Sequence, residues 1–224
     1  MTTPTPRAPV RAAALFDLDG TLVDTEPRSR AAWAALFAAH GVPVAPHALD
    51  AFAGRPGKEA IAEHLADFPG HTAEELYQEA KGYSGGPGMP ATRPVPGAVA
   101  LLVRLREEGV PLAVVTSGTR EYAKGELAAL GVLDLLDALV TADDVTRGKP
   151  DPEGYVRACA LLDVRPEDAV VFEDAPAGIE AARRAGAFCV ALTVTQPAEA
   201  LAGAGLVLPD LTGVTWPPVA PQRP

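Results

Sequence analysis

Asparagine is absent from the 224 residues, so the chain offers no acceptor for N-glycosylation. Cysteine is scarce as well, since only Cys159 and Cys189 occur, both in apolar surroundings and without the spacing of metal ligands. Two such residues exclude a disulfide scaffold and indicate reduced thiols in a reducing compartment. We therefore expect a cytoplasmic protein.

A surplus of basic residues and long apolar runs are also missing. The 19 Lys and Arg residues against 29 Asp and Glu residues give a formal net charge of −10. A chain this acidic lacks the electrostatic footprint of a nucleic-acid-binding protein. No apolar run approaches the ~20 residues that span a bilayer, and residues 1–9 lack the apolar core of a secretion signal. Neither a nucleic acid nor a membrane is expected as a partner.

The residues that are present are typical of a globular protein. Hydrophobic residues make up 48% of the chain and charged residues 21%, which excludes a disordered chain. The length is enough for one large domain, or for a core with a modest insertion. The proline-containing ends, 1–9 and 213–224, are expected to be flexible termini.

Strands and helices alternate through most of the chain. Short apolar runs at 10–16, 112–115, 138–141, 169–172 and 188–194 predict buried strands, and helical patterns lie between the later ones. Strands of this kind occur in parallel sheets that are covered on both faces by helices. The sequence therefore predicts an α/β fold with a parallel sheet.

A different kind of segment separates the first strand from the others. Residues 24–92 are rich in alanine and carry apolar side chains at helical spacing, with Gly/Pro breaks between the helices. We expect a small all-helical domain here, inserted into an α/β core made of residues 10–23 and 93–212.

Polar residues gather where the predicted strands end. The carboxyl ends of parallel strands meet at one edge of the sheet, where open α/β proteins bind their ligands. We expect three pairs that are far apart in the sequence to converge there. These pairs are Asp17 and Asp19, Thr116 and Ser117, and Glu173 and Asp174.

The strongest chemical signal is the stretch 17–24, Asp-Leu-Asp-Gly-Thr-Leu-Val-Asp. Asp17 and Asp19 follow an apolar strand directly, and in an extended chain their side chains would face opposite ways. Gly20 permits a tight turn. This turn must redirect Asp19 if both carboxylates serve one site.

Taken together, the motifs resemble those of the haloacid dehalogenase-like (HAD) superfamily. The first family motif, Asp-x-Asp-Gly-Thr, matches 17–21, and the second, a strand ending in Thr or Ser, matches 112–118. The third, a lysine, matches Lys149, and the acidic fourth matches Glu173-Asp174. All four occur in the family's order over nearly the whole chain. The resemblance implies a Rossmann-like core of HAD type with a small helical cap.

The resemblance also implies roles for these residues. Asp17 would be the nucleophile that forms an aspartyl-phosphate, and Asp19 would protonate the leaving alcohol and then activate water. Mg²⁺ would be held by the Asp17 carboxylate, the Asp19 backbone carbonyl and Asp174, with Glu173 close by, because hard oxygen ligands suit this ion. The phosphate would be cradled by Thr116, the backbone N–H groups of Ser117 and Gly118, and Lys149.

In this superfamily a cap in the position of 24–92 closes over the site and selects the substrate. Arg55 lies between Gly54 and Gly57 just before a helix, a setting suited to an anionic ligand. We expect Arg55 to touch the substrate, with Lys58 as a second candidate. A solvated surface arginine is the alternative interpretation of Arg55.

Two subgroups of the family are compatible with the motifs. β-Phosphoglucomutase-like members have a histidine after the first motif and a Lys-Asn pair after the second, where this chain has Ser29 and Thr119-Arg120. The stretches 116–120 and 172–178 instead resemble glycerol-3-phosphatase and 2-deoxyglucose-6-phosphatase type enzymes. We therefore predict a Mg²⁺-dependent phosphatase of a small phosphorylated metabolite, a sugar phosphate or glycerol phosphate. A sugar phosphomutase and a catalytically idle binding module are the alternatives, and the sequence does not indicate an oligomeric state.

Overall fold

The structure, a computed structural model, describes residues 12–52, 57–86 and 88–218. Its contacts divide the chain into two compact units, one made of the segments up to Val23 and from Pro94 onward, the other of Asp24–Arg93. Among the described residues, no helix has both the length and the apolar character needed to cross a bilayer.

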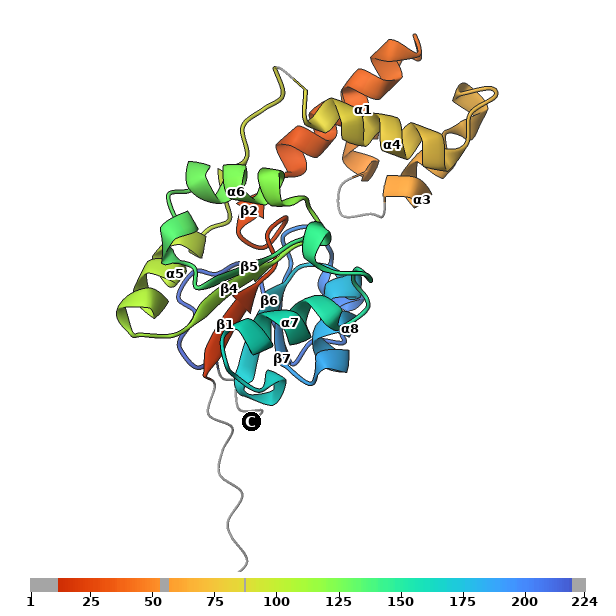
Figure 1. Cartoon of the computed structure of the whole chain (residues 1–224). Helices are drawn as coiled ribbons and strands as arrows, with labels where there is room; N and C mark the ends of the chain where they lie inside the picture. The colour runs from red at the N-terminus through yellow and green to blue at the C-terminus, as the bar shows by residue number, and fades with distance from the viewer. Residues whose placement is uncertain (1–11, 53–56, 87, 219–224) are drawn as a thin grey trace, which may run out of the picture. The chain divides into compact units, whose positions relative to one another are not determined.

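The first unit is built on a six-stranded sheet with the strand order β5-β4-β1-β6-β7-β8. Every neighbouring pair in it runs parallel. This confirms the α/β class with a parallel sheet (Figure 1). The strands are β1 (Ala13–Phe16), β4 (Leu112–Val115), β5 (Ala138–Val140), β6 (Ala169–Glu173), β7 (Phe188–Leu192) and β8 (Leu206–Leu208).

Helices cover both faces of this sheet. Alternate side chains of each strand point to opposite faces, so each face has its own set of apolar side chains. Phe16 and its neighbours on one face pack with α5 (Ala98–Glu107) and α6 (Arg120–Ala129). Leu15 and its neighbours on the other face pack with α7 (Glu153–Leu161) and α8 (Pro176–Ala185). Both faces of the sheet are therefore buried, as the continuous apolar strands predict. Short 3₁₀ turns lie at Leu133–Leu135, Ala142–Asp144, Pro166–Asp168 and Ala198–Leu201.

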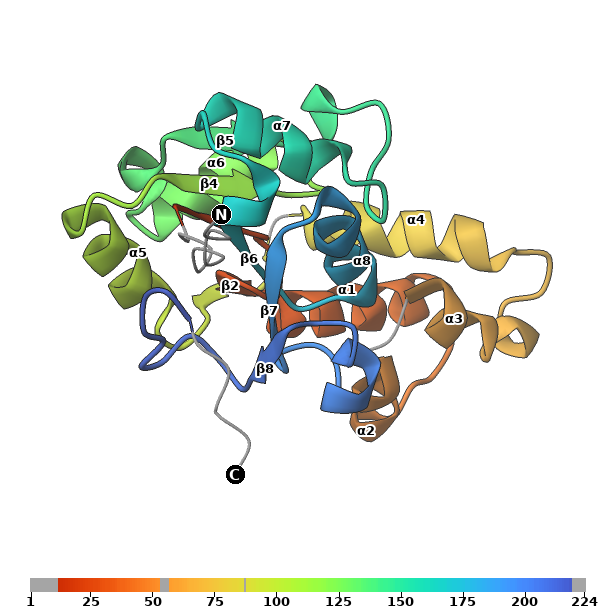
Figure 2. The same ribbon diagram turned by 90° about the horizontal axis from the view of Figure 1, so that it is seen from below.

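The second unit is helical and has a core of its own. Figures 1 and 2 show its two long helices, α1 (Glu26–Ala39) and α4 (Ala73–Ser84), side by side. Thr72 and Glu75 form a reciprocal capping box that begins α4. The shorter elements are α2 (Pro46–Leu49), α3 (Gly57–Ala62) and the 3₁₀ turns Asp50–Phe52 and Leu65–Asp67. The buried core side chains include Trp33, Leu36, Phe37, Phe52, Ile61, Phe68 and Leu76.

The chain passes between the units through two short strands, β2 (Val23–Asp24) and β3 (Arg93–Pro94), which pair with each other. These positions adjoin the boundaries that we predicted for the inserted helical segment. Whether that segment acts as a cap stays a prediction.

Two features differ from a simple interpretation of the sequence. The strand β8 was not expected, because Leu206–Leu208 is a short, half-buried run among glycines. Near the C-terminus, Val214 is buried in the core, and Arg104 donates a hydrogen bond to its carbonyl oxygen. Packing therefore extends into the proline-rich stretch that we assigned to a flexible terminus. The other terminal segment, 1–9, lies outside the described residues, as do 219–224.

Candidate active site

Three buried carboxylates meet at the carboxyl ends of the two central strands. Asp17 follows β1, Glu173 ends β6 and Asp174 follows it; β6 pairs with β1 through Phe16 and Phe172. The Asp17 N–H continues this pairing by donating to the Phe172 carbonyl at 2.9 Å. One carboxylate oxygen of each acidic residue lies within 4.8 Å of those of the other two. The parallel register thus brings together acidic residues more than 150 positions apart.

Lys149 reaches this group from the loop before α7. Its ammonium donates to Asp17 Oδ1, to Glu173 Oε1 at 2.6 Å and to the Val115 carbonyl at 3.1 Å. Burial favours the neutral amine, but the adjacent Asp17 and Glu173 carboxylates outweigh it and raise the pKa of Lys149. The lysine is therefore held as a cation against the acidic residues.

Glu173 is saturated with hydrogen-bond donors. Besides Lys149, its Oε1 accepts the phenol of Tyr155 at 2.7 Å, while Oε2 accepts the N–H groups of Asp174 at 3.0 Å and Ala175 at 3.2 Å. Gly178 lies on α8, and a Cβ at this position would lie 1.7 Å from Glu173 Oε1. Only glycine therefore leaves room for the Glu173 carboxylate. An ionised carboxylate has about four acceptor positions. Protein donors therefore occupy all the usual positions of Glu173.

A tight turn brings Asp19 back towards Asp17. Gly20 has φ of +82° and donates its N–H to the Val23 carbonyl at 2.7 Å. A Cβ here would lie 2.1 Å from Asp174 Oδ2, so the position needs glycine for space as well as for its backbone conformation. Asp19 is close enough to contribute to raising the pKa of both Asp17 and Asp174. The turn therefore provides the redirection that the sequence demands.

The electrostatics of this cluster favour a divalent cation. Burial, aided by Glu173, raises the pKa of Asp174 to about 7, and burial is also the main cause of the raised pKa of Asp17. The three carboxylates and the one ammonium leave two formal negative charges without compensation. All the ligand atoms offered are oxygens, which suit a hard cation such as Mg²⁺. The residues thus fit the metal that the resemblance implies.

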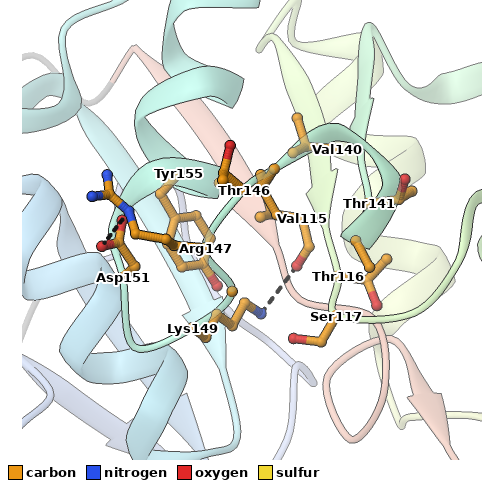
Figure 3. Close-up of a pocket in the computed structure, with 14 residues that line it drawn as sticks. Val115, Thr116, Ser117, Val140, Thr141, Thr146, Arg147, Lys149, Asp151 and Tyr155 are labelled. Carbon is orange, nitrogen blue, oxygen red and sulfur yellow. Dashed lines mark hydrogen bonds and ion pairs between the residues drawn. The ribbon is translucent and has the colours of Figure 1, made fainter.

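The second motif lies beside a cavity of about 200 Å³. Thr116, Ser117 and Lys149 line it, and Figure 3 shows the lysine side chain extending towards the Val115 carbonyl. Gly118 is not among the lining residues, and its N–H donates to Thr116 Oγ1 at 3.0 Å. Three of the four residues expected to cradle a phosphate therefore line one cavity.

Two residues of the helical unit, Arg55 and Lys58, are the ones predicted to contact the substrate. Arg55 lies outside the described residues. Lys58 forms an ion pair with Glu74 and lies 5.7 Å from the centre of the Tyr77 ring. Both of its partners belong to α4 of the same unit, so the described contacts of Lys58 are internal.

Three hydroxyl groups that the sequence analysis did not identify complete the site. Tyr155 donates to Glu173, Thr195 donates to Asp174 Oδ2, and Tyr122 donates to Asp19 Oδ1. Thr195 follows β7, so the rule that polar residues collect at strand ends could have found it. The two tyrosines lie on helices, where no local signal distinguishes them from core aromatics.

Comparison with known proteins agrees with this arrangement. Residues 12–186 match the family model of the haloacid dehalogenase-like hydrolases. The chain is 58% identical over 209 residues to validoxylamine A 7'-phosphate phosphatase of Streptomyces hygroscopicus subsp. limoneus, covering 93% of this chain and 98% of that protein. It is 36% identical over 206 residues to hexitol phosphatase A of Escherichia coli, covering 90% and 92%.

A solved structure has the same fold. The structure of CbbY from Rhodobacter sphaeroides in complex with phosphate superposes with a TM-score of 0.67 at 28% sequence identity, and the match covers 91% of this chain and 96% of that one. Fold, motif order and sequence relationship lead to the same conclusion: the chain belongs to the haloacid dehalogenase-like hydrolases.

Proposed function

We propose that this protein is a Mg²⁺-dependent phosphatase of a phosphorylated sugar or sugar-like polyol. One observation carries the proposal: a buried strand-end carboxylate, Asp17, is paired with a buried lysine and lies next to a second acidic residue, Asp174. An anionic phosphate repels a carboxylate nucleophile, so such a nucleophile needs positive charge around it. Lys149 supplies one such charge, and the acidic residues provide a place for a second.

Asp17, Asp174 and the backbone carbonyl of Asp19 are the proposed metal ligands. Bound there, Mg²⁺ would supply Lewis-acid polarisation of the phosphoryl oxygens. Glu173 is the nearby carboxylate whose acceptor positions are filled by Lys149, Tyr155 and backbone N–H groups. We therefore assign Glu173 the task of orienting Lys149.

The reaction divides into two displacements at phosphorus. An oxygen of Asp17 attacks, the bond from phosphorus to the ester oxygen breaks, and Asp19 gives its proton to the departing oxygen, which leaves as the alcohol. Asp19 then takes a proton from water as the water oxygen attacks the same phosphorus. The bond to Asp17 breaks, which releases inorganic phosphate and restores the Asp17 carboxylate and protonated Asp19.

Thr116, the N–H groups of Ser117 and Gly118, and Lys149 are the proposed phosphate contacts. The cavity beside three of them is about 200 Å³. The hydrogen bond from the Gly118 N–H to Thr116 Oγ1 must open before this N–H can donate to a phosphate. Lys149 is held in the site as a cation, but its three N–H bonds go to Asp17, Glu173 and the Val115 carbonyl, so one of them must also be released to a phosphate.

The substrate class is inferred from the relatives. The names of the two relatives give validoxylamine A 7'-phosphate and hexitol phosphates as their substrates, and a hexitol is a sugar alcohol with a hydroxyl group on every carbon. We propose a substrate of the same kind. Residues 24–92, with Arg55 and Lys58, form the proposed cap that would recognise the hydroxylated part.

The contacts of Arg120 favour hydrolysis over the mutase alternative. Arg120 occupies one position of the Lys-Asn pair of β-phosphoglucomutase-like members. Its guanidinium is paired with Asp144, and its backbone N–H donates to Asp143 Oδ2 at 2.8 Å. Since a carboxylate already neutralises this guanidinium, it is a poor receptor for the second phosphate of a sugar bisphosphate.

Phosphate release with and without Mg²⁺ tests the proposal. The panel holds hexitol phosphates, validoxylamine A 7'-phosphate, hexose 6- and 1-phosphates, glycerol phosphates and phosphoglycolate. We expect Mg²⁺-dependent release from the polyol and sugar esters. Interconversion of hexose phosphates that requires a bisphosphate primer would indicate the mutase. No phosphate release from any of these compounds would favour a binding module.

Asp17→Asn is the matched variant for this assay, because it removes the nucleophile at nearly constant volume. We expect no turnover and an unchanged circular dichroism spectrum. The control is Asp134→Asn, which changes an exposed carboxylate in the same unit and should leave the rate unaltered. An Asp17→Asn protein as active as the wild type would overturn the assignment.

A further inference from the structure

Tyr122 reaches the site from outside every sequence motif. It lies in the first turn of α6, and its phenol donates a hydrogen bond to Asp19 Oδ1. The two residues are 103 positions apart, so only the tertiary structure brings them together. Neither the metal nor the phosphate contacts proposed above give this phenol a task.

Contacts with Thr119 and Gly118 help to place Tyr122. The hydroxyl of Thr119, the N-cap residue of α6, accepts the Tyr122 N–H at 3.4 Å. The ring itself contacts Gly118: a Cβ on this glycine would lie 2.8 Å from Cδ1 and 3.3 Å from Cε1 of the ring. The phenol therefore approaches Asp19 from a fixed direction.

We infer that Tyr122 is a positioning residue for Asp19. The inference rests on the proposed function, in which Asp19 transfers a proton twice. The Asp19 side chain turns about two single bonds, whereas general acid and base catalysis needs its oxygen within hydrogen-bond distance of the departing oxygen and then of the water. The Tyr122 phenol holds the carboxyl group in one orientation through both transfers and keeps its own proton throughout.

Tyr122→Phe tests this with two substrates that differ in their need for a proton. A hexitol phosphate releases an alkoxide that must be protonated, whereas 4-nitrophenyl phosphate releases a stable phenolate. With the hexitol phosphate we expect kcat to fall about tenfold to hundredfold, as expected for a misplaced acid, at nearly constant KM. With 4-nitrophenyl phosphate we expect the first-turnover burst to be unchanged. The later steady rate should fall, because water must still lose a proton.

Glu121→Gln is the control, since it changes an exposed side chain next to Tyr122 in the first turn of α6. It should leave both reactions unchanged. Wild-type kinetics in Tyr122→Phe would overturn the inference. So would an equal loss in the burst and in hexitol phosphate turnover, which would assign the phenol to general packing. A wild-type enzyme that releases phosphate from neither ester would overturn the proposed function itself, and the inference with it.

Discussion

Lys149→Met should destabilise the metal-free protein in a way that Mg²⁺ partly reverses. The variant keeps most of the side-chain volume but leaves Asp17 and Glu173 without the ammonium that contacts both. The Lys149 and Asp17 side chains are only 12% and 10% exposed, and Glu173 is 1% exposed, so water replaces little of the lost interaction. Removing one partner of a buried ion pair costs about 3–5 kcal/mol, which we expect at pH 8.

The loss should depend on pH with a definite sign. Burial raises the pKa of Asp174 to about 7 and that of Asp17 above its usual range, so the folded chain holds protons that the unfolded chain releases. Stability of the metal-free protein therefore falls as pH rises from about 4 through about 7. Without Lys149 this fall becomes steeper, and the variant should approach the wild type at pH 5.

Urea unfolding in EDTA at pH 5 and pH 8, repeated with Mg²⁺, measures these effects. Ligand binding at a hundred times its dissociation constant adds about 2.7 kcal/mol, so Mg²⁺ should restore part of the stability at pH 8. Lys124→Met, which changes an exposed lysine of the same unit, is the control. Equal midpoints for Lys149→Met and the wild type at pH 8 in EDTA would refute the reasoning.

Three further changes test other parts of the core. Gly178→Ala would place a methyl group 1.7 Å from Glu173 Oε1. Overpacking of this kind costs about 1–3 kcal/mol of stability. In a phosphate-release assay we expect kcat to fall at least about tenfold. The hydrogen bond from Arg120 is the main cause that lowers the pKa of Asp144 to about 2. Asp144→Asn should therefore lower the free energy of unfolding by about 1–2 kcal/mol above pH 4. In urea unfolding this difference from the wild type should vanish as pH falls through 2. Thr21 is buried and its hydroxyl has no hydrogen-bond partner, so Thr21→Val should raise stability by about 1 kcal/mol, and an unchanged or lower urea midpoint would contradict this.

The sequence by itself determined the parallel α/β architecture and which polar residues lie at the carboxyl ends of its strands. A buried parallel strand must be apolar throughout, so the first polar residue after it marks the carboxyl end. This rule predicts Asp17, Thr116 and Glu173 at the carboxyl ends of β1, β4 and β6, where they lie. It missed β8, since three half-buried residues carry too little pattern to distinguish a strand from a loop.

Only the tertiary structure decided what each of these side chains contacts. Lys149 lies on a loop, and nothing local shows that its ammonium joins Asp17 to Glu173. Tyr122 and Tyr155 are helical residues that in sequence resemble any core aromatic, yet each donates to a carboxylate of the site. Backbone direction and burial follow from local periodicity, whereas a hydrogen bond between distant residues depends on how helices pack on the sheet, which local periodicity does not encode.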